Sequence, residues 1–516
     1  MLWLPLLLAA AFILHRVLRF LVLLRRHKST KGCRLLFDPF SFPGNVIPTT
    51  WWNLGFRWTW IYRRTAHFEH AYDLTTIIPV FGNPYYVGAS VDIAKQVWGN
   101  ELKMNLAKPQ DFTTERIFGS SIASAQGADW SRHRRAVAPS FNTAMYSRVV
   151  EESDVVYRDM VSKEAWEEKN NVVVADLDRI LRRFALVMIC RCGFGMPVEW
   201  TQGRDHSELS TFDRELSVAA RTIILRLILP GWVWKLPIQS LRSILQSWKN
   251  VLFLMTSIAA RRQTEFALEK NFGDGNITDL LTKLVSATDD GNKYALEPAE
   301  VTADMMALLF AGNETTSSAL FSTITLLAFH PDEQEKAYQE ILREAPCKEG
   351  LNLSIISNLK HPFACFNEAH RLVPATINLP RVTTEDTPIH SFRPVERDLI
   401  IPKGSRIVID IVSVLHNPHD FPEPEKYIPS RWYDATEHDF LMFGFGPRVC
   451  LGRRFAQTEA VCFLAHFLRD WKVEVVLEAG ETAAQAWNRI AADATLRGTA
   501  FSLGSVPIKF IARDSN

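Results

Sequence analysis

Cysteine is scarce in this chain, and its number is odd. The seven cysteines are scattered over 516 residues, at positions 33, 190, 192, 347, 365, 450 and 462. An odd and scattered set argues against a disulfide framework and favours a reducing compartment. Cys190 and Cys192 form only a C-x-C pair inside an apolar helical pattern, which favours core packing over a metal site.

A strong charge of either sign is also missing. Lys and Arg number 58 against 57 Asp and Glu, so the formal net charge is +1 and gives no global signal for nucleic acid. The chain has no G-x-G-x-x-G after a strand and no Walker loop, which excludes the common dinucleotide- and nucleotide-binding loops. With 47% hydrophobic and 22% charged residues, the chain has the composition of a folded protein with a large core.

The apolar run at the N-terminus is shorter than the about 20 residues that a membrane span needs. Residues 1–14 carry no charged side chain and residues 20–24 are apolar, with Arg16 and Arg19 between them. Because arginine side chains can reach the lipid headgroups, we expect residues 1–28 to form an uncleaved membrane anchor that ends in a basic cluster. That cluster predicts a cytosolic body. A cleaved signal peptide is disfavoured, because no charged segment precedes the apolar core.

The remainder of the chain is expected to be one hinge and one body. Four residues, Pro39, Pro43, Gly44 and Pro48, make residues 29–50 a semi-rigid hinge, which leaves residues 51–516 as the folded body. Within the body, residues 230–237 form an apolar loop with two tryptophans. We expect this loop to lie against a membrane, with a buried corner as the alternative.

Three glycines surround a single cysteine in the stretch 443–452. Glycine lets a backbone take positive φ and lie close to a flat ligand. A helix predicted from Arg453 onward would stabilise negative charge on the sulfur of Cys450 through its N-terminal dipole, which suits a thiolate metal ligand. The alternative is a glycine-rich turn around a buried structural cysteine.

Trp130 and Arg134 are spaced i, i+4 and therefore share one face of a predicted helix. An indole N–H beside a guanidinium can grip a carboxylate. The alternative is a solvated basic helix. Three further basic residues lie off this face and are expected to form a docking surface: Arg132, His133 and Arg135.

A long helix is predicted from Glu297 to Phe329, with Pro331 after its end. Its centre reads Ala311-Gly312-Asn313-Glu314-Thr315-Thr316. These residues have a low helix propensity for a buried helix. The Thr315 hydroxyl can bond the carbonyl of Ala311 and bend the helix, opening a groove. The alternative is a helix that tolerates polar residues, but a buried Glu314 then needs a partner, and none is apparent nearby.

Further along the chain, Glu368 and Arg371 form an i, i+3 pair whose default interpretation is a surface salt bridge. Residues 172–194 are expected to be helical and buried, and residues 399–410 to form a hairpin with its turn at Lys403-Gly404. The strand-like residues 507–511 are expected to form a second hairpin that brings Phe501 to a pocket.

Four of these motifs carry a resemblance to a known family. The pattern Phe-x-x-Gly-x-Arg-x-Cys-x-Gly resembles the haem-thiolate signature of the cytochrome P-450 family at every defined position. The Trp-x-x-x-Arg, Ala-Gly-x-Glu-Thr-Thr and Glu-x-x-Arg motifs are similar to further elements of that family and occur in its order. The resemblance covers roughly residues 50 to 516.

The resemblance implies roles for particular residues. Cys450 is implied to be the axial thiolate of a haem b iron. The haem propionates are implied to contact Trp130, Arg134, Arg381 and Arg448, and the haem loop is implied to be shaped by Phe443, Gly446 and Gly452. Thr315 is implied to steady dioxygen and Glu314 to relay protons. Glu368, Arg371 and Arg431 are implied to form a structural lock behind the haem loop.

By the same resemblance the fold is mainly α with a small β-rich region, and the function is that of a haem-dependent monooxygenase. Because the chain has no nicotinamide or flavin loop of its own, electrons are expected from an NADPH-dependent reductase in the endoplasmic reticulum membrane. The segment 48–52 is similar to microsomal members from mushroom-forming fungi, which favours a terpenoid or other secondary metabolite as substrate. Two rivals are a haem-thiolate isomerase or dehydratase without reductase and a non-enzymatic haem sensor.

Overall fold

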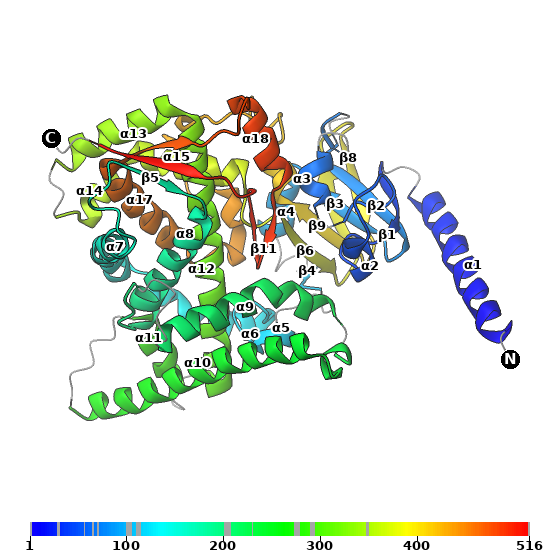
Figure 1. The fold of residues 1–516 in the computed structure, drawn as a ribbon. Coiled ribbons are helices and arrows are strands. Elements are labelled where there is room, and N and C mark those ends of the chain that lie inside the picture. The colour runs from blue at the N-terminus through cyan, green and yellow to red at the C-terminus, as the bar shows by residue number, and fades with distance from the viewer. Residues whose placement is uncertain are drawn as a thin grey trace. The chain divides into compact units, whose positions relative to one another are not determined.

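The chain forms two compact units in the computed structural model (Figure 1). Unit 1 comprises Met1–Phe112, Ile377–Lys426 and Leu441–Val449, and unit 2 comprises Thr113–Thr376, Tyr427–Phe440 and Cys450–Asn516. The structure describes residues 3–27, 31–55, 57–63, 67–69, 72–99, 106–109, 115–200, 208–229, 231–272, 279–288, 295–346 and 350–513.

Unit 1 is built on a six-stranded sheet of order β1-β2-β3-β9-β6-β4. Its strands are β1 (Gly32–Phe37), β2 (Leu74–Phe81), β3 (Tyr85–Gly88), β4 (Leu106–Ala107), β6 (Asn378–Thr383) and β9 (Arg406–Asp410). The pairs β1–β2 and β3–β9 are parallel, and the others are antiparallel. A separate pair joins β7 (Thr387–Ser391) to β8 (Arg397–Ile401). Short helices complete the unit: α2 (Phe42–Val46), α3 (Trp58–Arg63), α4 (Val91–Gly99) and α16 (Ile411–Leu415).

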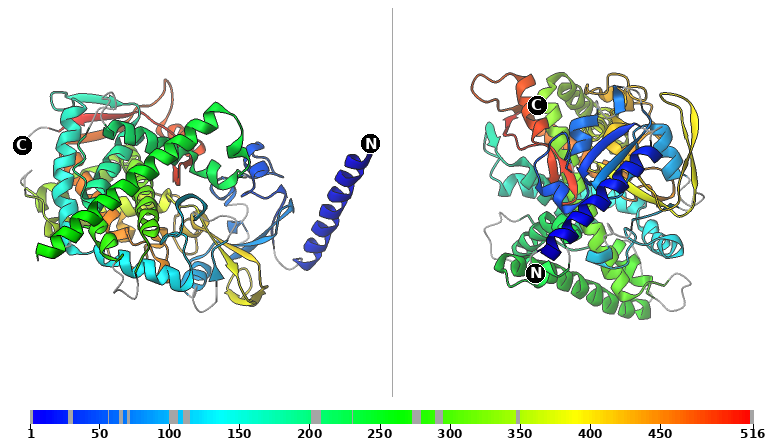
Figure 2. Two further views of the ribbon diagram at one scale, coloured as in Figure 1. Left: turned by 90° about the horizontal axis from the view of Figure 1, so that it is seen from below. Right: turned by 90° about the vertical axis from the view of Figure 1, so that its right-hand side faces the viewer.

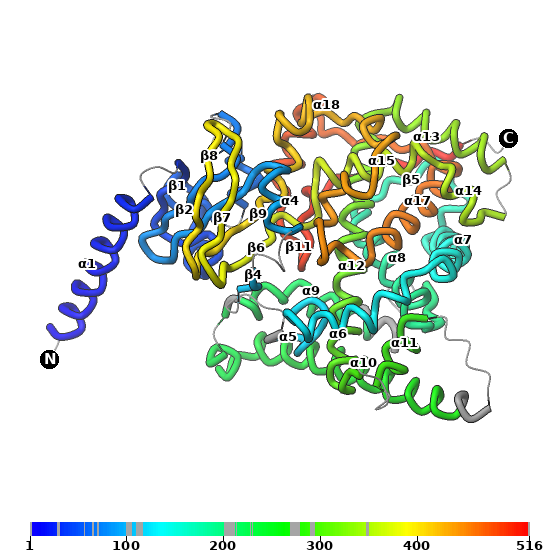
Figure 3. Tube along the Cα trace, turned by 180° about the vertical axis from the view of Figure 1, so that it is seen from behind, coloured from blue at the N-terminus to red at the C-terminus, as the bar shows by residue number. Residues whose placement is uncertain are grey.

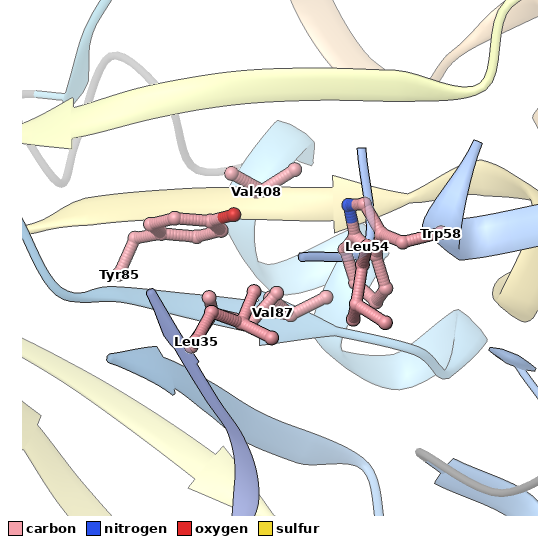
Figure 4. Close-up of a cluster of buried hydrophobic side chains, with 7 residues drawn as sticks. Leu35, Leu54, Trp58, Tyr85, Val87 and Val408 are labelled. Carbon is pink, nitrogen blue, oxygen red and sulfur yellow. The ribbon is translucent and has the colours of Figure 1, made fainter. Parts of the chain in front are cut away.

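A core of unit 1 forms where α3 and Leu54, which precedes it, cover the sheet. Figure 4 shows the side chains that meet there, which are Leu35, Leu54, Trp58, Tyr85, Val87 and Val408, together with Ile77. All seven are at most 3% exposed. Because β-branched and aromatic residues pack well on a pleated surface, these strands gain their stability from this shared apolar face.

Two expectations for unit 1 need correction. Strand β1 and helix α2 lie within residues 29–50, so much of the predicted hinge belongs to the sheet or packs beside it. The predicted hairpin 399–410 is also wrong, because β8 pairs with β7 while β9 pairs with β3 and β6. The turn at Lys403-Gly404 does form, but β9 is buried throughout its middle and needs a neighbour on each edge.

Helix α1 (Trp3–Arg26) is long and apolar enough to cross a membrane, as judged by length and composition. Its two central arginines bond to the turn between β2 and β3. Arg16 Nε and Nη2 donate to the carbonyls of Val80 and Gly82 at 2.9 and 2.7 Å, and Arg19 Nη2 donates to Asn83 Oδ1 at 2.7 Å. Protein acceptors therefore satisfy the charges that interrupt the apolar run.

Unit 2 is mainly helical and is organised around α12 (Pro298–Phe329). This helix begins with a capping box between Glu297 and Glu300 and ends just before Pro331, which explains its bounds. The other helices of the unit are α5 (Glu115–Phe118), α6 (Gly127–Val137), α7 (Thr143–Lys163), α8 (Leu177–Met188), α9 (Glu208–Ile228), α10 (Gln239–Phe272), α11 (Leu280–Ser286), α13 (Pro331–Glu344), α14 (Leu353–Asn358), α15 (Lys360–Leu372), α17 (Arg453–Asp470) and α18 (Ala483–Ala492). Figure 1 shows α8 and α15 beside α12, α9 and α10 lie side by side in Figure 2, and α7 lies next to α17 in Figure 3.

Two small sheets complete unit 2. The first has the order β10-β13-β5, with β5 (Asn171–Val174), β10 (Trp471–Val475) and β13 (Ile508–Ala512). The second pairs β11 (Thr495–Arg497) with β12 (Ala500–Ser502). The expected helix 172–194 is therefore wrong at its start, because residues 172–174 form a strand that pairs with β13. The predicted fold class, mainly α with a small β-rich part, is confirmed.

The expectation for Phe501 is wrong. Phe501 lies in β12 and is 0% exposed, so its ring belongs to the core. Its backbone N–H donates to the carbonyl of Ala375 at 2.8 Å, and its own carbonyl accepts from Ser318 Oγ at 2.6 Å. The tail strand β13 pairs with β10 and β5 and does not pair with β12. Strand-like composition predicted a strand here, but not its partners.

Candidate active site

The segment before Cys450 belongs to unit 1 and is shaped by glycine. It contains the 3-10 helices η7 (Leu441–Phe443) and η8 (Gly446–Arg448), and both Phe443 and Arg448 are half-buried. Gly446 has φ +75°, and a Cβ there would lie 2.5 Å from the carbonyl oxygen of Trp98. Only glycine fits this close approach to the backbone of α4. The expected approach of this loop to a flat ligand stays a prediction.

Cys450 is the first residue of the unit 2 segment that continues into α17. Gly452 is the N-cap residue of this helix, and the backbone N–H groups of Gly452 and Arg453 hydrogen-bond to the sulfur. Although the Cys450 side chain is exposed, the surrounding protein excludes enough water that burial raises the pKa of its thiol; these N–H groups oppose the rise. Such a sulfur becomes a thiolate most readily when a metal replaces its proton.

Trp130 and Arg134 lie on one face of α6, as predicted. The guanidinium carbon of Arg134 is 5.9 Å from the centroid of the Trp130 ring. Trp130 is buried and Arg134 is half-buried, and burial lowers the pKa of Arg134. The charge of Cys450 acts in the opposite direction on that pKa, so the guanidinium and the sulfur are close enough to interact. This pair suits a carboxylate beside the thiolate.

The expected docking surface on α6 is wrong for two of its three residues. His133 is 0% exposed. Arg132 donates to both carboxylate oxygens of Glu300, at 2.6 and 2.7 Å. Only Arg135 is exposed. A run of basic letters indicated a solvated face, but acidic residues from another helix cover it.

The centre of α12 has one accessible face. Leu308, Gly312 and Thr315 are half-buried and Ala311 is exposed, whereas the neighbouring residues of the helix are buried. Their spacing of i, i+3, i+4 and i+7 defines a single stripe along the helix. The Thr315 hydroxyl donates to the Ala311 carbonyl at 2.6 Å, so the predicted bond within the helix is confirmed. We call these four residues the accessible stripe of α12.

Glu314 points to a different side of the helix. Its side chain is buried, and its Oε2 accepts hydrogen bonds from the backbone N–H and the hydroxyl of Thr499. Arg182 Nη1 lies 3.8 Å from Oε1. Burial raises the pKa of Glu314, and the Thr499 bonds and Arg182 oppose this rise. The expectation of no nearby partner is therefore wrong, because the partner comes from the turn between β11 and β12.

That turn supplies a residue that motif reasoning missed. Gly498 has φ +66°, and a Cβ there would lie 2.0 Å from Glu314 Oε1. Only glycine can stand against the carboxylate. The available signal was a Gly-Thr pair between two short strand-like runs, which is typical of a tight hairpin turn.

The residues expected to form a structural lock come together in unit 2. Glu368 and Arg371 are both fully buried, so the surface interpretation of this pair is wrong. Glu368 accepts from Arg371 Nε and Nη2 at 2.8 and 2.9 Å and from Arg431 Nε at 3.4 Å. The backbone N–H of Ile428 and the indole of Trp432 each donate to it at 2.9 Å. No motif in the sequence pointed to the last two donors.

The other two arginines of the predicted set lie in unit 1. Arg381 is on β6 and is 6% exposed; its Nη1 donates to the carbonyl of Pro380 at 2.9 Å. Arg448 lies in η8. Cys450, Trp130 and Arg134 lie in unit 2. The predicted site residues thus form two sets, linked by the peptide bond between Val449 and Cys450.

The residues of unit 2 alone are suited to binding an iron porphyrin. The unit holds a sulfur with N–H donors at a helix start, a Trp–Arg pair suited to carboxylates, and the accessible stripe of α12 with the Thr315 hydroxyl. A thiolate is an established axial ligand of haem iron, and the porphyrin carries carboxylates that such cations bind. The fold and these residues define the class of haem-thiolate proteins.

Comparison with known proteins agrees with this class. The sequence model of the family described as Cytochrome P450 matches residues 43–491. Cytochrome P450 monooxygenase 124 of Postia placenta is 28% identical over 89% of this chain and 89% of its own length. Cytochrome P450 3A16 of Mus musculus is 26% identical over 76% of this chain and 77% of its own length. The crystal structure of the cytochrome P450DA heme domain has a TM-score of 0.68 at 19% identity, covering 86% of this chain and 90% of that one.

The chain belongs to the cytochrome P450 family. It is a P450 monooxygenase with a haem-thiolate cofactor, and like its family it uses dioxygen, an organic substrate and a redox partner. Its apolar N-terminal helix α1 is consistent with a membrane anchor.

Proposed function

We propose that this protein transfers one oxygen atom from O2 into a lipophilic terpenoid or other secondary metabolite. The second oxygen atom is reduced to water with electrons from an NADPH-dependent reductase. The observation that carries this proposal is the accessible stripe of α12, which presents the Thr315 hydroxyl in the same unit as Cys450. A haem sensor would need neither this hydroxyl nor the buried acid beside it.

When bound, haem b supplies the iron that activates dioxygen. Cys450 would be its sulfur ligand, with the N–H groups of Gly452 and Arg453 stabilising the sulfur charge. The resemblance to the family assigns the propionates to Trp130, Arg134, Arg381 and Arg448. The backbone at Phe443, Gly446 and Gly452 would shape the loop around the ligand.

Two neighbouring residues of α12, Glu314 and Thr315, can hold a proton and donate a hydrogen bond, respectively. Burial raises the pKa of Glu314, which favours a proton on its carboxyl. Its Oε1 accepts no hydrogen bond within the described part of the chain and is the atom on which that proton would reside. A relay from Glu314 to the stripe requires the bonds from Thr499 to open. The Thr315 hydroxyl would be the group on the stripe that could hydrogen-bond to bound dioxygen.

Aromatic packing next to the stripe supports a lipophilic substrate. Phe310, directly before Ala311, stacks on Trp248 with ring centroids 5.4 Å apart, and Phe118 lies 5.2 Å from Phe310. Leu308 adds an aliphatic side chain to the stripe itself. Such a surface favours apolar molecules over charged ones.

We also propose that residues 1–28 anchor the protein in the endoplasmic reticulum membrane and that the catalytic body is cytosolic. This body comprises the predicted residues 51–516 together with β1 and α2. The apolar composition of α1 and its basic end support this orientation. In the loop after α9, Trp232 is 65% exposed, which contradicts a buried corner and favours contact with the lipid surface.

Coupled consumption of substrates tests the proposed activity. The protein, a fungal NADPH-dependent reductase and candidate terpenoids should consume NADPH and O2 and yield a product that carries one atom from labelled O2. Product formation without reductase would instead identify an isomerase or dehydratase. Haem binding with no turnover of any oxidisable substrate would favour the sensor and overturn the proposal.

Thr315→Ala is expected to uncouple NADPH consumption from product formation. Without the hydroxyl on the stripe, less of the consumed NADPH should appear as oxygenated product and more as hydrogen peroxide, by about 10-fold or more in the ratio. The haem spectrum should stay unchanged. Both products are measured per NADPH consumed.

Two variants control the Thr315 experiment. Thr316→Ala removes the same groups from the next residue, which is buried off the stripe, and should keep the wild-type ratio. Thr315→Ser keeps the hydroxyl and should restore most of the coupling. Full product yield in Thr315→Ala would remove the residue from the mechanism and leave its bond to Ala311 as a helix-bending contact.

Deletion of residues 1–28 is expected to release the protein into the soluble fraction while haem binding persists. The deletion removes the apolar α1 but no residue assigned to the haem. Fractionation of membranes, with haem absorbance as the second readout, measures both effects. Unchanged membrane attachment would identify the segment around Trp232 as the dominant contact, and loss of haem would show that α1 belongs to the fold through its bonds to the β2–β3 turn.

A further inference from the structure

A buried polar cluster joins α6 to the first turns of α12, apart from the residues assigned to the haem. His133 Nδ1 lies 2.7 Å from Asp304 Oδ2, and both side chains are fully buried. The other oxygen of Asp304 accepts from the backbone N–H of Ile122 at 2.6 Å. Beside this pair, Arg132 holds both oxygens of Glu300, whose Oε1 also lies 3.5 Å from His133 Nε2.

The chemistry of this cluster indicates more than packing. Burying charged and polar groups is costly unless each finds a partner, and apolar residues of similar size would hold two helices together equally well. What a directed hydrogen bond adds is a fixed position of one helix on the other. Burial raises the pKa of Asp304, and its bond to His133 opposes that rise.

The cluster lies on the same stripes as the proposed haem contacts. On α12, Glu300 and Asp304 precede Leu308 by two turns and one turn, so they lie on the same face of the helix as the accessible stripe. On α6, His133 is next to Arg134 and follows Trp130 by three residues. Helix α6 thus contacts α12 one to two turns before the accessible stripe.

We propose that His133 and Asp304 are positioning residues for the haem. Their hydrogen bond sets where α6 presents Trp130 and Arg134 along α12, and the Ile122 contact holds the segment before α6 against the same carboxylate. The cluster therefore determines how tightly the porphyrin is retained, while Cys450 determines how the iron is ligated. This inference rests on the proposed haem site.

Haem retention tests the inference directly. The full-length haem-loaded protein is mixed with excess apomyoglobin, and the rate of haem transfer is followed by absorbance. His133→Ala and Asp304→Ala should each release haem about 10-fold faster than the wild type, as loss of an outer partner does at metal sites. The double variant should be no faster than either single variant, because both remove one shared interaction.

Conservative and matched variants separate positioning from general stability. His133→Asn keeps a donor near the place of Nδ1 and should restore most of the retention. His361→Ala removes another buried histidine of unit 2, one that bonds Tyr433 and the carbonyl of Glu333. It should lower thermal stability without accelerating haem transfer. If His133→Ala does not fold, Asp304→Asn gives the same comparison, because it keeps an acceptor for Ile122 but removes the charge.

Failure of the positioning role and failure of the proposed haem site give different results in these experiments. Wild-type transfer rates in His133→Ala and Asp304→Ala, or in Asp304→Asn where it substitutes for them, would overturn the positioning role, as would equal acceleration in His361→Ala. In either case the carbon-monoxide spectrum of a thiolate-ligated ferrous haem would persist in the wild type. Absence of that spectrum from the wild type itself would instead refute the proposed haem site, and the inference with it.

Discussion

Cys450→Ala is expected to abolish the carbon-monoxide spectrum of a thiolate-ligated ferrous haem and all oxygenated product. Cys450 is the only residue of the predicted motif with a sulfur, and two backbone N–H groups hydrogen-bond to it at the start of α17. Alanine leaves those groups without an anion and the iron without its electron-donating ligand. The measurement is the reduced carbon-monoxide difference spectrum together with total haem per protein.

A second cysteine on the same helix gives a matched control. Cys462 lies on α17 and is 0% exposed, and burial raises the pKa of its thiol. Cys462→Ala should therefore keep the thiolate spectrum and lose only some packing energy. Persistence of the spectrum in Cys450→Ala, with its loss in Cys462→Ala, would move the ligand to Cys462 and contradict the proposed site.

Local features of the site were predictable from the sequence. The bounds of α12 follow from Glu297, Pro298 and Pro331, and the bond from Thr315 to Ala311 spans a single helical turn. The common face of Trp130 and Arg134 likewise follows from helical spacing. Each of these inferences needs only residues a few positions apart, which is the range over which backbone geometry fixes neighbours.

Contacts between distant segments were not predictable in this way. Thr499 meets Glu314 across 185 positions, and Asp304 meets His133 across 171. Nothing in the local pattern of either helix states which acidic residue will contact which basic one. The sequence alone therefore predicts a surface position for His133 and no partner for Glu314. Strand pairing has the same limit, because β8 and β9 both read as strands but belong to different sheets.

The burial of a residue pair decides between an exposed salt bridge and a buried structural contact where the motif allows both. Glu368 and Arg371 read equally well as an exposed pair or as a lock, and only their burial and three further donors decide between these. An exposed pair would contribute little, because solvent screens it. A buried carboxylate that accepts hydrogen bonds from five donor groups contributes more, because its removal leaves all five donors without their acceptor.

Glu368→Ala is accordingly expected to destabilise unit 2 by about 3–5 kcal/mol, the usual cost of leaving a buried ion without its partner. The fully buried guanidinium of Arg371 loses the acceptor of its Nε and Nη2, and the indole of Trp432 loses its acceptor as well. Urea unfolding followed by circular dichroism measures the change as a lower midpoint.

Two further variants keep the Glu368 experiment decisive. Glu368→Gln keeps the shape and one acceptor oxygen, so it should fall between the wild type and Glu368→Ala and serves where the alanine variant does not accumulate. Arg261→Ala removes an i, i+4 Arg–Glu pair whose arginine side chain is 82% exposed, and its midpoint should match the wild type. A Glu368→Ala midpoint equal to that of Arg261→Ala would contradict the lock, because the buried network would then contribute no more than a screened surface pair.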